Sequence, residues 1–332
     1  VESRGLGDVY KRQVVIQAYE DLSNRVAGGV ALMLGCCGAI SEWAGRYEMT
    51  EKVNEQLKQE LARLGDPIII AGCPSCMKQL KESIGAHVIG IWEILRKIGL
   101  PQQAKGLEIP VAIHDACGAR GDAQTQDTIR QLLSDMGCIV EDTEYSRDLS
   151  PCCGYGGLTA YANKDMAAKM TEKCLERSDA PYITYCMACR DRFAREGRES
   201  RHIMELLYGA NASNMPDISE KRYNRLILKQ TLLKNIWNEE PIMEKKDYTV
   251  AYTEEAIHMM DERMILKSDV ERVLSDYREN REAILDEETK ELVTRSRLGN
   301  VTFWVRFVET EDGYLVHRAY SHRMNIMKRV GQ

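Results

Sequence analysis

Cysteine is the residue that most constrains this chain. The 332 residues include 11 cysteines, and all of them lie between Cys36 and Cys189. Within this stretch, a Cys-Cys-Gly segment followed by a Cys-x-x-Cys segment occurs twice. The first occurrence holds Cys36, Cys37, Cys73 and Cys76, and the second holds Cys152, Cys153, Cys186 and Cys189, with Cys117 upstream. The recurrence predicts an internal duplication and makes these cysteines the candidate functional residues.

Short apolar runs precede most of these cysteines. The runs lie at residues 30–34, 67–70, 111–113 and 182–185, and they alternate with helical patterns at 49–64, 128–136 and 190–195. Strands that alternate with helices are typical of α/β folds with doubly wound parallel sheets. Ligands of such folds bind beyond the carboxyl ends of the strands. We therefore expect the cysteine-bearing loops to converge at one place.

The composition changes after the last cysteine and divides the chain. We expect a first repeat at residues 14–105, a second at 106–212, and a helical linker at 213–246 whose polar helix covers 217–240. Residues 247–332 predict a small α+β unit with a helix over 253–264 and a second helix opened by a capping box at Ser268–Glu271. Three strands at 292–298, 301–308 and 314–320 follow, separated by Gly299-Asn300 and Glu311-Asp312-Gly313. These turn sequences predict a three-stranded antiparallel meander.

The first 13 residues fit no structural pattern. The segment Asp8-Val9-Tyr10-Lys11-Arg12-Gln13 is also encoded by one reading frame of a common sequencing adapter, so we interpret residues 1–13 as an assembly artefact joined to a truncated repeat. A genuine flexible terminus is the alternative. By analogy with Cys117, a fifth cysteine of the first repeat would fall near position 1, where none is present. Either that cysteine was lost in evolution, or it belongs to a native segment upstream of Val14.

The chemistry of the cysteines favours a metal centre. A site made of thiolates alone selects zinc or an iron–sulfur cluster. Structural zinc is saturated by four ligands, whereas the second repeat offers Cys117, Cys152, Cys153, Cys186 and Cys189. The extra thiol favours iron–sulfur chemistry over zinc and over reduced structural thiols. Cys138 and Cys174 lie outside the repeated pattern and are expected to be buried, inert thiols.

Other features exclude several classes of protein. The formal net charge of −6 gives no electrostatic reason to expect nucleic-acid binding. No apolar run reaches the roughly 18 residues that a membrane-spanning helix needs, so we expect no transmembrane segment in this chain. No Gly-x-Gly-x-x-Gly follows a strand, so flavin or NAD would belong to a partner. Thiols in a long chain without a visible secretory leader indicate a cytoplasmic location.

The cysteine pattern resembles the CCG cysteine-rich domain family. The resemblance rests on His114-Asp115-Ala116-Cys117, on Pro151-Cys152-Cys153-Gly154 and on the Cys-x-x-Cys pairs, and it covers residues 25–208. Members include heterodisulfide reductase subunits B and D and the iron–sulfur subunits of glycolate, lactate and anaerobic glycerol-3-phosphate dehydrogenases. The resemblance implies two pseudo-symmetric Rossmann-like halves, each able to hold a [4Fe-4S] cluster, which in heterodisulfide reductases is a non-cubane cluster on five cysteines.

Carried over residue by residue, the resemblance assigns one cluster to each cysteine set. Cys117, Cys152, Cys153, Cys186 and Cys189 would bind the second cluster, and Cys36, Cys37, Cys73 and Cys76 the first. The chain departs from relatives at Ala116, where many have proline, and at Gly118, where catalytic subunits can have histidine. These departures put coenzyme-M-type disulfide chemistry in doubt. Asn300–Trp304 and Ala319–Met324 resemble a tail of some bacterial members to which no function is attached.

These observations predict an oxidoreductase subunit of heterodisulfide-reductase type. It would take electrons from a redox partner, such as a flavoprotein, a ferredoxin-like protein or a membrane cytochrome, and deliver them to a disulfide, a quinone or another carrier. It would be cytoplasmic or peripheral on a membrane complex. His114 is a candidate proton donor beside the second cluster, or else a hydrogen-bonding residue that orders its loop. The alternative function is a non-catalytic zinc-binding or scaffold module whose C-terminal unit docks partners.

Overall fold

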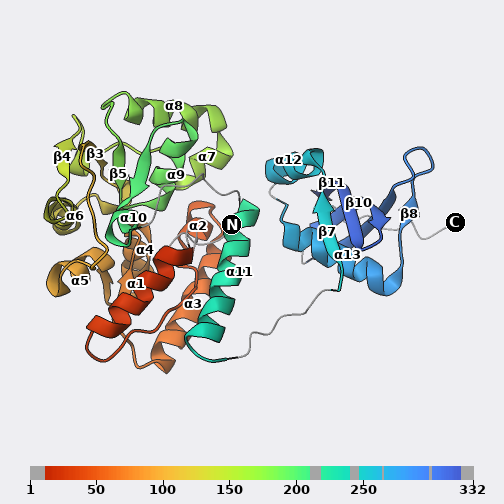
Figure 1. The fold of residues 1–332 in the computed structure, drawn as a ribbon, viewed down its shortest axis with the longest axis horizontal. Coiled ribbons are helices and arrows are strands. Elements are labelled where there is room, and N and C mark those ends of the chain that lie inside the picture. The colour runs from red at the N-terminus through yellow and green to blue at the C-terminus, as the bar shows by residue number, and fades with distance from the viewer. Residues whose placement is uncertain (1–11, 210–217, 240–246, 264, 299–300, 323–332) are drawn as a thin grey trace. The chain divides into compact units, whose positions relative to one another are not determined.

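The computed structural model describes residues 12–209, 218–239, 247–263, 265–298 and 301–322 (Figure 1). The chain forms two compact units: unit 1 comprises Val1–Met215 and Asn224–Leu232, and unit 2 comprises Pro216–Tyr223 and Leu233–Gln332. Helix α11 (Ile218–Asn235) supplies residues to both. Most of the predicted adapter-derived segment lies outside the described residues. No helix in the described ranges is long and apolar enough to cross a membrane.

The first half of unit 1 is mainly helical and carries a small parallel sheet. Strands β1 (Ile69–Ala71) and β2 (Val88–Gly90) pair in parallel, with Ile69 opposite Val88. The helix predicted at 49–64 is confirmed as α3, and the strand predicted at 67–70 as β1. The helices of this half are α1 (Arg12–Arg25), α2 (Ala39–Trp43), α3 (Tyr47–Arg63), α4 (Pro74–Ile84) and α5 (Ile91–Ile98).

The strand predicted at residues 30–34 is absent. These residues have no regular secondary structure, and their side chains alternate between half-buried and exposed. In the second half, the corresponding strand before the paired cysteines pairs with a central strand. Helix α1 precedes residues 30–34, and no strand in the described residues pairs with them. A strand needs a hydrogen-bonding neighbour, so the apolar run alone does not suffice.

The second half of unit 1 contains a four-stranded parallel sheet in the order β4-β3-β5-β6. Its strands are β3 (Pro110–His114), β4 (Ile139–Asp142), β5 (Tyr182–Thr184) and β6 (Ser200–His202), and its α-helices are α6 (Ala123–Asp135), α7 (Thr159–Ala162), α8 (Lys164–Leu175), α9 (Met187–Arg195) and α10 (Ile203–Leu207). Short 3₁₀ helices η1 (Cys117–Ala119), η2 (Arg147–Leu149) and η3 (Gly156–Leu158) lie in the cysteine-bearing loops. The predicted parallel α/β architecture is confirmed here.

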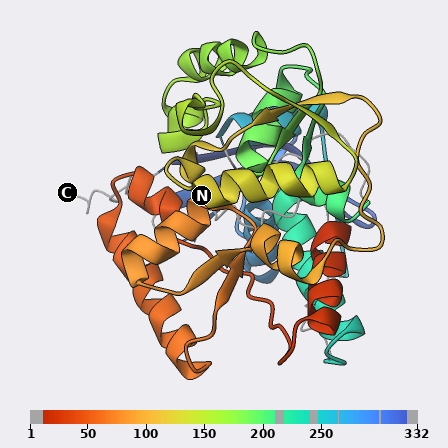
Figure 2. The same cartoon turned by 90° about the vertical axis from the view of Figure 1, so that its left-hand side faces the viewer.

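A core shared by the two halves joins them into one unit. It contains Val14 and Leu22 of α1, Trp92 of α5, Ile113 of β3 and Leu132 of α6. A second cluster on the other face of the four-stranded sheet includes Ala112, Cys153, Cys174, Cys189 and Phe193. The two halves lie one above the other in both views, red to orange and yellow to green (Figures 1 and 2).

A local sequence of elements recurs in the two halves. β1 leads through Cys73 into α4, then β2 and α5; β5 leads through Cys186 into α9, then β6 and α10. The last helix of each group has the same cap, in which Glu93 accepts from the Gly90 N–H at 2.9 Å and Glu205 from the His202 N–H at 2.8 Å. This recurrence is local, and the pseudo-symmetry of whole halves stays a prediction.

Unit 2 is an α+β unit with a five-stranded sheet in the order β7-β11-β10-β9-β8. Its strands are β7 (Thr249–Tyr252), β8 (Ile284–Leu285), β9 (Leu292–Leu298), β10 (Val301–Thr310) and β11 (Gly313–His322), and its helices are α12 (Glu254–Arg263) and α13 (Lys267–Asn280). The antiparallel meander β9-β10-β11 is confirmed. The core packs Val270 and Leu274 against Val305 and Phe307. Gly299-Asn300 and the Arg323-Met324 end of the tail lie outside the described residues.

Two details of unit 2 differ from prediction. The meander is extended by β8 on one side and by β7, which pairs in parallel with β11, on the other. The capping box predicted at Ser268 is wrong, because α13 begins earlier, with Leu266 as the N-cap. Asp269 accepts from the Leu266 N–H at 3.1 Å, which places Ser268 inside the first turn.

Candidate metal centre

The two Cys-x-x-Cys segments each begin a helix. Cys73 and Cys186 are the N-cap residues of α4 and α9, with extended φ values of −147° and −132°. Cys76 and Cys189 follow in the first helical turn. The first N–H groups of a helix have no intrahelical acceptor and carry partial positive charge. The spacing therefore places both cysteines of each pair at the positively polarised start of a helix.

The glycine of each Cys-Cys-Gly segment turns the chain sharply after the cysteines. Gly38 and Gly154 have φ values of 83° and 90°, a conformation that other residues rarely adopt. At Gly154 a Cβ atom would lie 2.4 Å from the Ala167 carbonyl oxygen. The turn directs the glycine N–H back to the first cysteine: Gly38 N–H donates to Cys36 Sγ at 3.4 Å, and Gly154 N–H to Cys152.

The second cysteine of each Cys-Cys-Gly segment meets the last cysteine of each Cys-x-x-Cys segment. The Cys76 thiol donates to Cys37 Sγ at 3.1 Å. In the second set, the equivalent pair is Cys189 and Cys153, and Cys189 lowers the pKa of Cys153. Within each Cys-x-x-Cys segment, the first cysteine also raises the pKa of the second, so the two thiols lie close together. The structure therefore brings together Cys37, Cys73 and Cys76, with Cys36 beside Gly38.

The second set is larger because Cys117 joins it. Cys117 begins η1, directly after β3. A Cβ atom on Gly156 would lie 3.3 Å from Cys152 Sγ and 3.7 Å from Cys117 Sγ, so these two sulfurs lie close together. Mutual pKa shifts connect Cys117, Cys152, Cys153, Cys189 and Cys186, which places the five thiols in one neighbourhood. Cys153 and Cys189 are buried, whereas Cys117, Cys152 and Cys186 are half-buried. All the cysteines predicted for the second site lie in one group that reaches the surface on one side.

Ionisation is unequal within these groups. Hydrogen bonds from the Cys117 and Cys153 thiols lower the pKa of Cys152 to about 2, and the bond from Cys76 lowers the pKa of Cys37 to about 7. The pKa values of the donors Cys117, Cys153 and Cys76 rise, because they donate to a neighbouring thiolate and are desolvated. One thiolate therefore suppresses the ionisation of the others. Full deprotonation requires a positive charge among the sulfurs, which a bound metal supplies.

The residues present fit a thiophilic metal group by donor type. Every side chain in the thiol contacts is cysteine, and Gly156 keeps space beside them: a Cβ atom there would lie 3.3 Å from Cys152 Sγ. In the described part of the chain, no group of three or more His, Cys, Asp or Glu side chains is placed so that it could hold a metal ion as it stands. The 3.1 Å separation of Cys37 and Cys76 is shorter than the roughly 3.8 Å edge of a tetrahedral thiolate site with zinc–sulfur bonds near 2.3 Å. The sulfurs would separate on binding.

His114 lies at the end of β3, on the same face of the sheet as Ala112 and the core that contains Cys153 and Cys189. Its ring is 4% exposed and packs edge-on against Phe193, at 4.8 Å between centroids. Burial lowers the pKa of His114 to about 4, although the charges of Asp115 and Cys152 favour the protonated ring. Nε2 is buried and has no hydrogen-bond partner among the residues that the structure describes. The structure therefore holds a neutral imidazole with one unused nitrogen near the second set.

Cys138 and Cys174 are placed as predicted, outside the thiol groups. Cys138 is buried in the core shared by the two halves, and burial raises its pKa. Cys174 is on α8, in the same cluster as Cys153, and burial raises its pKa to about 11. Its thiol donates to the Cys152 carbonyl oxygen at 3.6 Å, so it contacts backbone rather than another sulfur.

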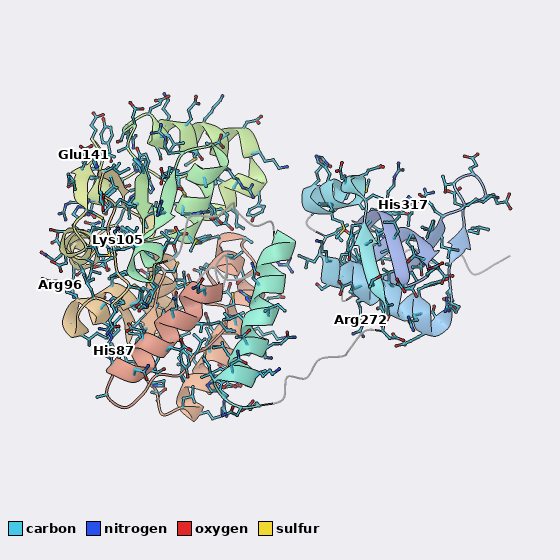
Figure 3. All side chains as sticks on the ribbon, in the orientation of Figure 1. His87, Arg96, Lys105, Glu141, Arg272 and His317 are labelled. Atoms are coloured by element: carbon cyan, nitrogen blue, oxygen red, sulfur yellow. The ribbon has the colours of Figure 1, made fainter. Side chains whose placement is uncertain are left out.

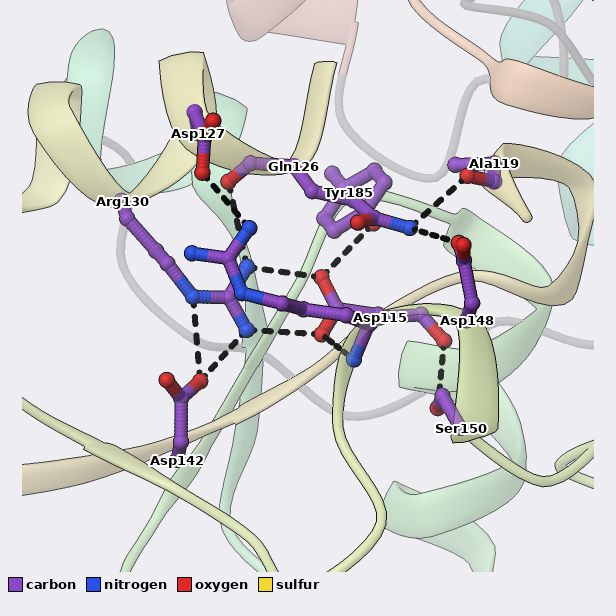
Figure 4. A network of polar contacts seen from close by, with 10 residues as sticks. Asp115, Ala119, Gln126, Asp127, Arg130, Asp142, Asp148, Ser150 and Tyr185 are labelled. Carbon is purple, nitrogen blue, oxygen red and sulfur yellow. Dashed lines mark hydrogen bonds and ion pairs between the residues drawn. The ribbon is translucent and has the colours of Figure 1, made fainter. Parts of the chain in front are cut away.

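Sequence reasoning missed the carboxylate beside the second set. Asp115 is fully buried two positions before Cys117 and binds Arg130 and Tyr185 (Figure 4). Desolvation opposes its ionisation, but the Arg130 hydrogen bond and charge hold its pKa below the usual range. This carboxylate belongs to the segment His114-Asp115-Ala116-Cys117, which carries part of the family resemblance.

Two segments, residues 27–81 and 111–193, match the family model described as "Cysteine-rich domain" (CCG). The segments contain all the cysteines of the first and second sets. The match supports the CCG domain family for this part of the chain, which is consistent with an iron–sulfur or metal-binding redox module. No curated protein and no solved structure matches the chain.

Proposed function

We propose that this chain is an iron–sulfur subunit of heterodisulfide-reductase type. The observation that carries the proposal is the group of Cys117, Cys152, Cys153, Cys186 and Cys189, whose thiols lie near enough to shift one another's pKa, with the sulfurs of Cys117 and Cys152 side by side at Gly156. The number of thiols exceeds what one zinc ion binds. A bound iron–sulfur cluster would supply one-electron redox chemistry at this place.

The accessible side of the group determines what can react there. Cys117, Cys152 and Cys186 are half-buried, while Cys153 and Cys189 are enclosed by the core. An electron donor or acceptor would therefore approach from the Cys117–Cys152 side. The donor would be a redox partner such as a flavoprotein, a ferredoxin-like protein or a membrane cytochrome, and the acceptor a disulfide, a quinone or another carrier. The chain would work in the cytoplasm or at a membrane surface.

His114 is the residue that we propose for hydrogen bonding or proton transfer at this centre. Its ring is neutral, and its Nε2 is buried without a partner beside the core that holds Cys153. A buried polar atom without a partner is costly, so an acceptor supplied with the metal group would relieve that cost. In this role the neutral His114 ring would keep its proton at Nε2 and donate a hydrogen bond towards sulfur.

The test is a matched pair of cysteine variants. Cys153 and Cys174 lie in the same core cluster with exposures of 1% and 2%, so replacement by alanine removes a similarly buried sulfur at each position. Cys153→Ala is expected to abolish iron at the second set after anaerobic reconstitution, because a ligand is lost. Cys174→Ala is expected to keep that iron and to lose only packing, on the order of 1 kcal/mol.

Iron, acid-labile sulfide and the electron paramagnetic resonance spectrum of the oxidised protein are the measurements. Equal loss of iron from the two variants would contradict the assignment, and a wild-type chain that takes up neither iron nor sulfide would refute the proposed function.

The number of cysteines in the first set favours a second candidate function. Cys36, Cys37, Cys73 and Cys76 provide the four thiols that close a structural zinc site. Zinc without visible absorbance would indicate a zinc-binding or scaffold module instead.

A further inference from the structure

The carboxylate of Asp115 is the hydrogen-bond acceptor at the centre of a buried polar network (Figure 4). Oδ1 accepts from Arg130 Nη1 at 3.0 Å and from the Tyr185 hydroxyl at 2.9 Å. Oδ2 accepts from Arg130 Nη2 at 2.7 Å and from the Arg147 backbone N–H at 2.6 Å. The side chain is fully buried, so these bonds replace all of its contacts with water. Removing such an acceptor leaves several buried donors without partners, which is costly.

Asp115 and two of its donors, Tyr185 and Arg147, belong to the loops that carry the cysteines. Asp115 itself lies two positions before Cys117, and Tyr185 immediately precedes Cys186. Arg147 begins η2, which leads to Cys152, and the Ser150 hydroxyl donates to the Asp115 carbonyl oxygen at 2.8 Å. One residue therefore ties together the loops of Cys117, Cys152 and Cys186. These are the three half-buried cysteines of the second set, which the core does not enclose.

Backbone conformation supports the same conclusion. Arg147 has a φ of 57°, which is unfavourable for a residue with a side chain. Such a conformation persists where surrounding contacts determine it. Its N–H is held by Asp115, and its side chain pairs with Asp127 at 2.6 Å. The loop before Cys152 is therefore held in a conformation that it would not adopt unaided.

The network is anchored to the regular structure of the second half. Arg130 lies on α6, and its guanidinium also pairs with Asp142 at the end of β4. The arginine thus connects the Asp115 carboxylate to a helix and a strand that do not carry cysteines. Planar, two-pronged pairing of arginine with a carboxylate fixes orientation as well as distance.

We propose that Asp115 is a positioning residue for the second cysteine set, which holds the loops of Cys117, Cys152 and Cys186 in the arrangement that lets their thiols bind one metal group. The role deepens the proposed function and rests on it. Asp115 has no direct part in ligation or electron transfer. It acts through the loops, and its loss changes how the cysteines are presented rather than how many there are.

The test compares Asp115→Asn with Asp142→Asn in the full chain. Asparagine matches aspartate in size but gives Arg130 a neutral partner and places an amide NH₂ among donors. We expect Asp115→Asn to lose the same share of iron as Cys153→Ala, or to keep iron with shifted resonance lines and a changed reduction potential. Asp142→Asn removes the other carboxylate from Arg130 and touches no cysteine loop, so it should match the wild type. A wild-type spectrum and potential in Asp115→Asn would overturn the proposal.

A milder variant covers the case in which Asp115→Asn does not fold. Tyr185→Phe removes only the hydroxyl that donates to Asp115 and is expected to shift the resonance lines while the circular dichroism stays unchanged. An unchanged electron paramagnetic resonance spectrum in this variant would contradict the positioning role of Asp115. Cobalt(II) titration of the metal-free chain reads the same thiols without iron. If the wild type takes up no iron, the proposed function fails. Equal cobalt–thiolate absorbance in wild type and Asp115→Asn would then refute the positioning role separately.

Discussion

Acid should destabilise unit 1 through His202, and the structure sets the size of the effect. His202 is 1% exposed and is the N-cap of α10, where Nδ1 accepts from the Met204 N–H at 3.3 Å. Burial lowers its pKa from 6.5 to about 4, although the Glu205 charge and a hydrogen bond to the Tyr185 backbone oppose the shift. The imidazole is therefore neutral in the folded chain at pH values where the unfolded chain already binds a proton.

The sign and the magnitude follow from this difference. Between pH 6.5 and pH 4 the unfolded state holds the extra proton, so the free energy of unfolding falls as the pH falls through this window and levels off below it. For these two pKa values, the loss between pH 7 and pH 5 is about 2 kcal/mol. Replacing His202 by asparagine keeps a capping side chain and removes the titration. The variant should therefore lose about 2 kcal/mol less than the wild type over the same interval.

The assay is hydrogen–deuterium exchange of a peptide over residues 200–207 in the metal-free chain, measured from pH 7 to pH 5 after correction for intrinsic exchange. This peptide reports the exchange protection of β6 and α10, and unit 2 does not contribute to its signal. His87→Asn is the matched control, since His87 is exposed (Figure 3), and should follow the wild type. The reasoning is refuted if His202→Asn and the wild type lose protection equally on acidification.

Two further changes test how the sites are built into unit 1. Gly118→Ala should destabilise unit 1 by about 1–3 kcal/mol, measured by urea unfolding. The new Cβ would lie 2.8 Å from Ser75 Oγ and 3.0 Å from Ser75 N, and because backbone is involved, Ser75→Ala should not rescue it. Deleting residues 247–332 should leave iron per chain unchanged, because that segment contains no cysteine and its helices and sheet have their own core. Iron loss on deletion would instead tie unit 2 to the metal centre.

The elements next to the cysteines were predictable because several signals agree there. The run at 111–113 is apolar, β-branched in part and followed by a polar segment, and it forms β3. The helix predicted at 190–195 is present, but it begins at Met187, inside the Cys-x-x-Cys segment, as α4 begins at Pro74 inside the other. What failed depends on distant partners. β7 forms by pairing with β11 across a large separation in sequence, and residues 30–34 lack such a partner in the described structure.

The same distinction applies to the candidate site. Spacing alone identified the cysteines that the structure brings into contact, since each thiol is fixed by a local turn or helix start. The Asp115 network could not be read from spacing, because its donors Arg130, Arg147 and Tyr185 belong to separate elements. Only the folded sheet brings these residues to one carboxylate. The residue pattern alone does not distinguish a buried aspartate from a solvent-exposed one beside a cysteine.

The two cysteine sets share their local contacts and differ in what surrounds them. Both have a glycine N–H directed at the first cysteine and a thiol contact between the second and the last. The second set adds Cys117 and loops held by Asp115, whereas Cys36 and Cys37 follow a segment without strand pairing. Ordering a loop costs about 1–2 kcal/mol per residue, and a binding site already ordered avoids that cost. For equal metal–sulfur bonding, we therefore expect the second set to bind a metal group more favourably than the first.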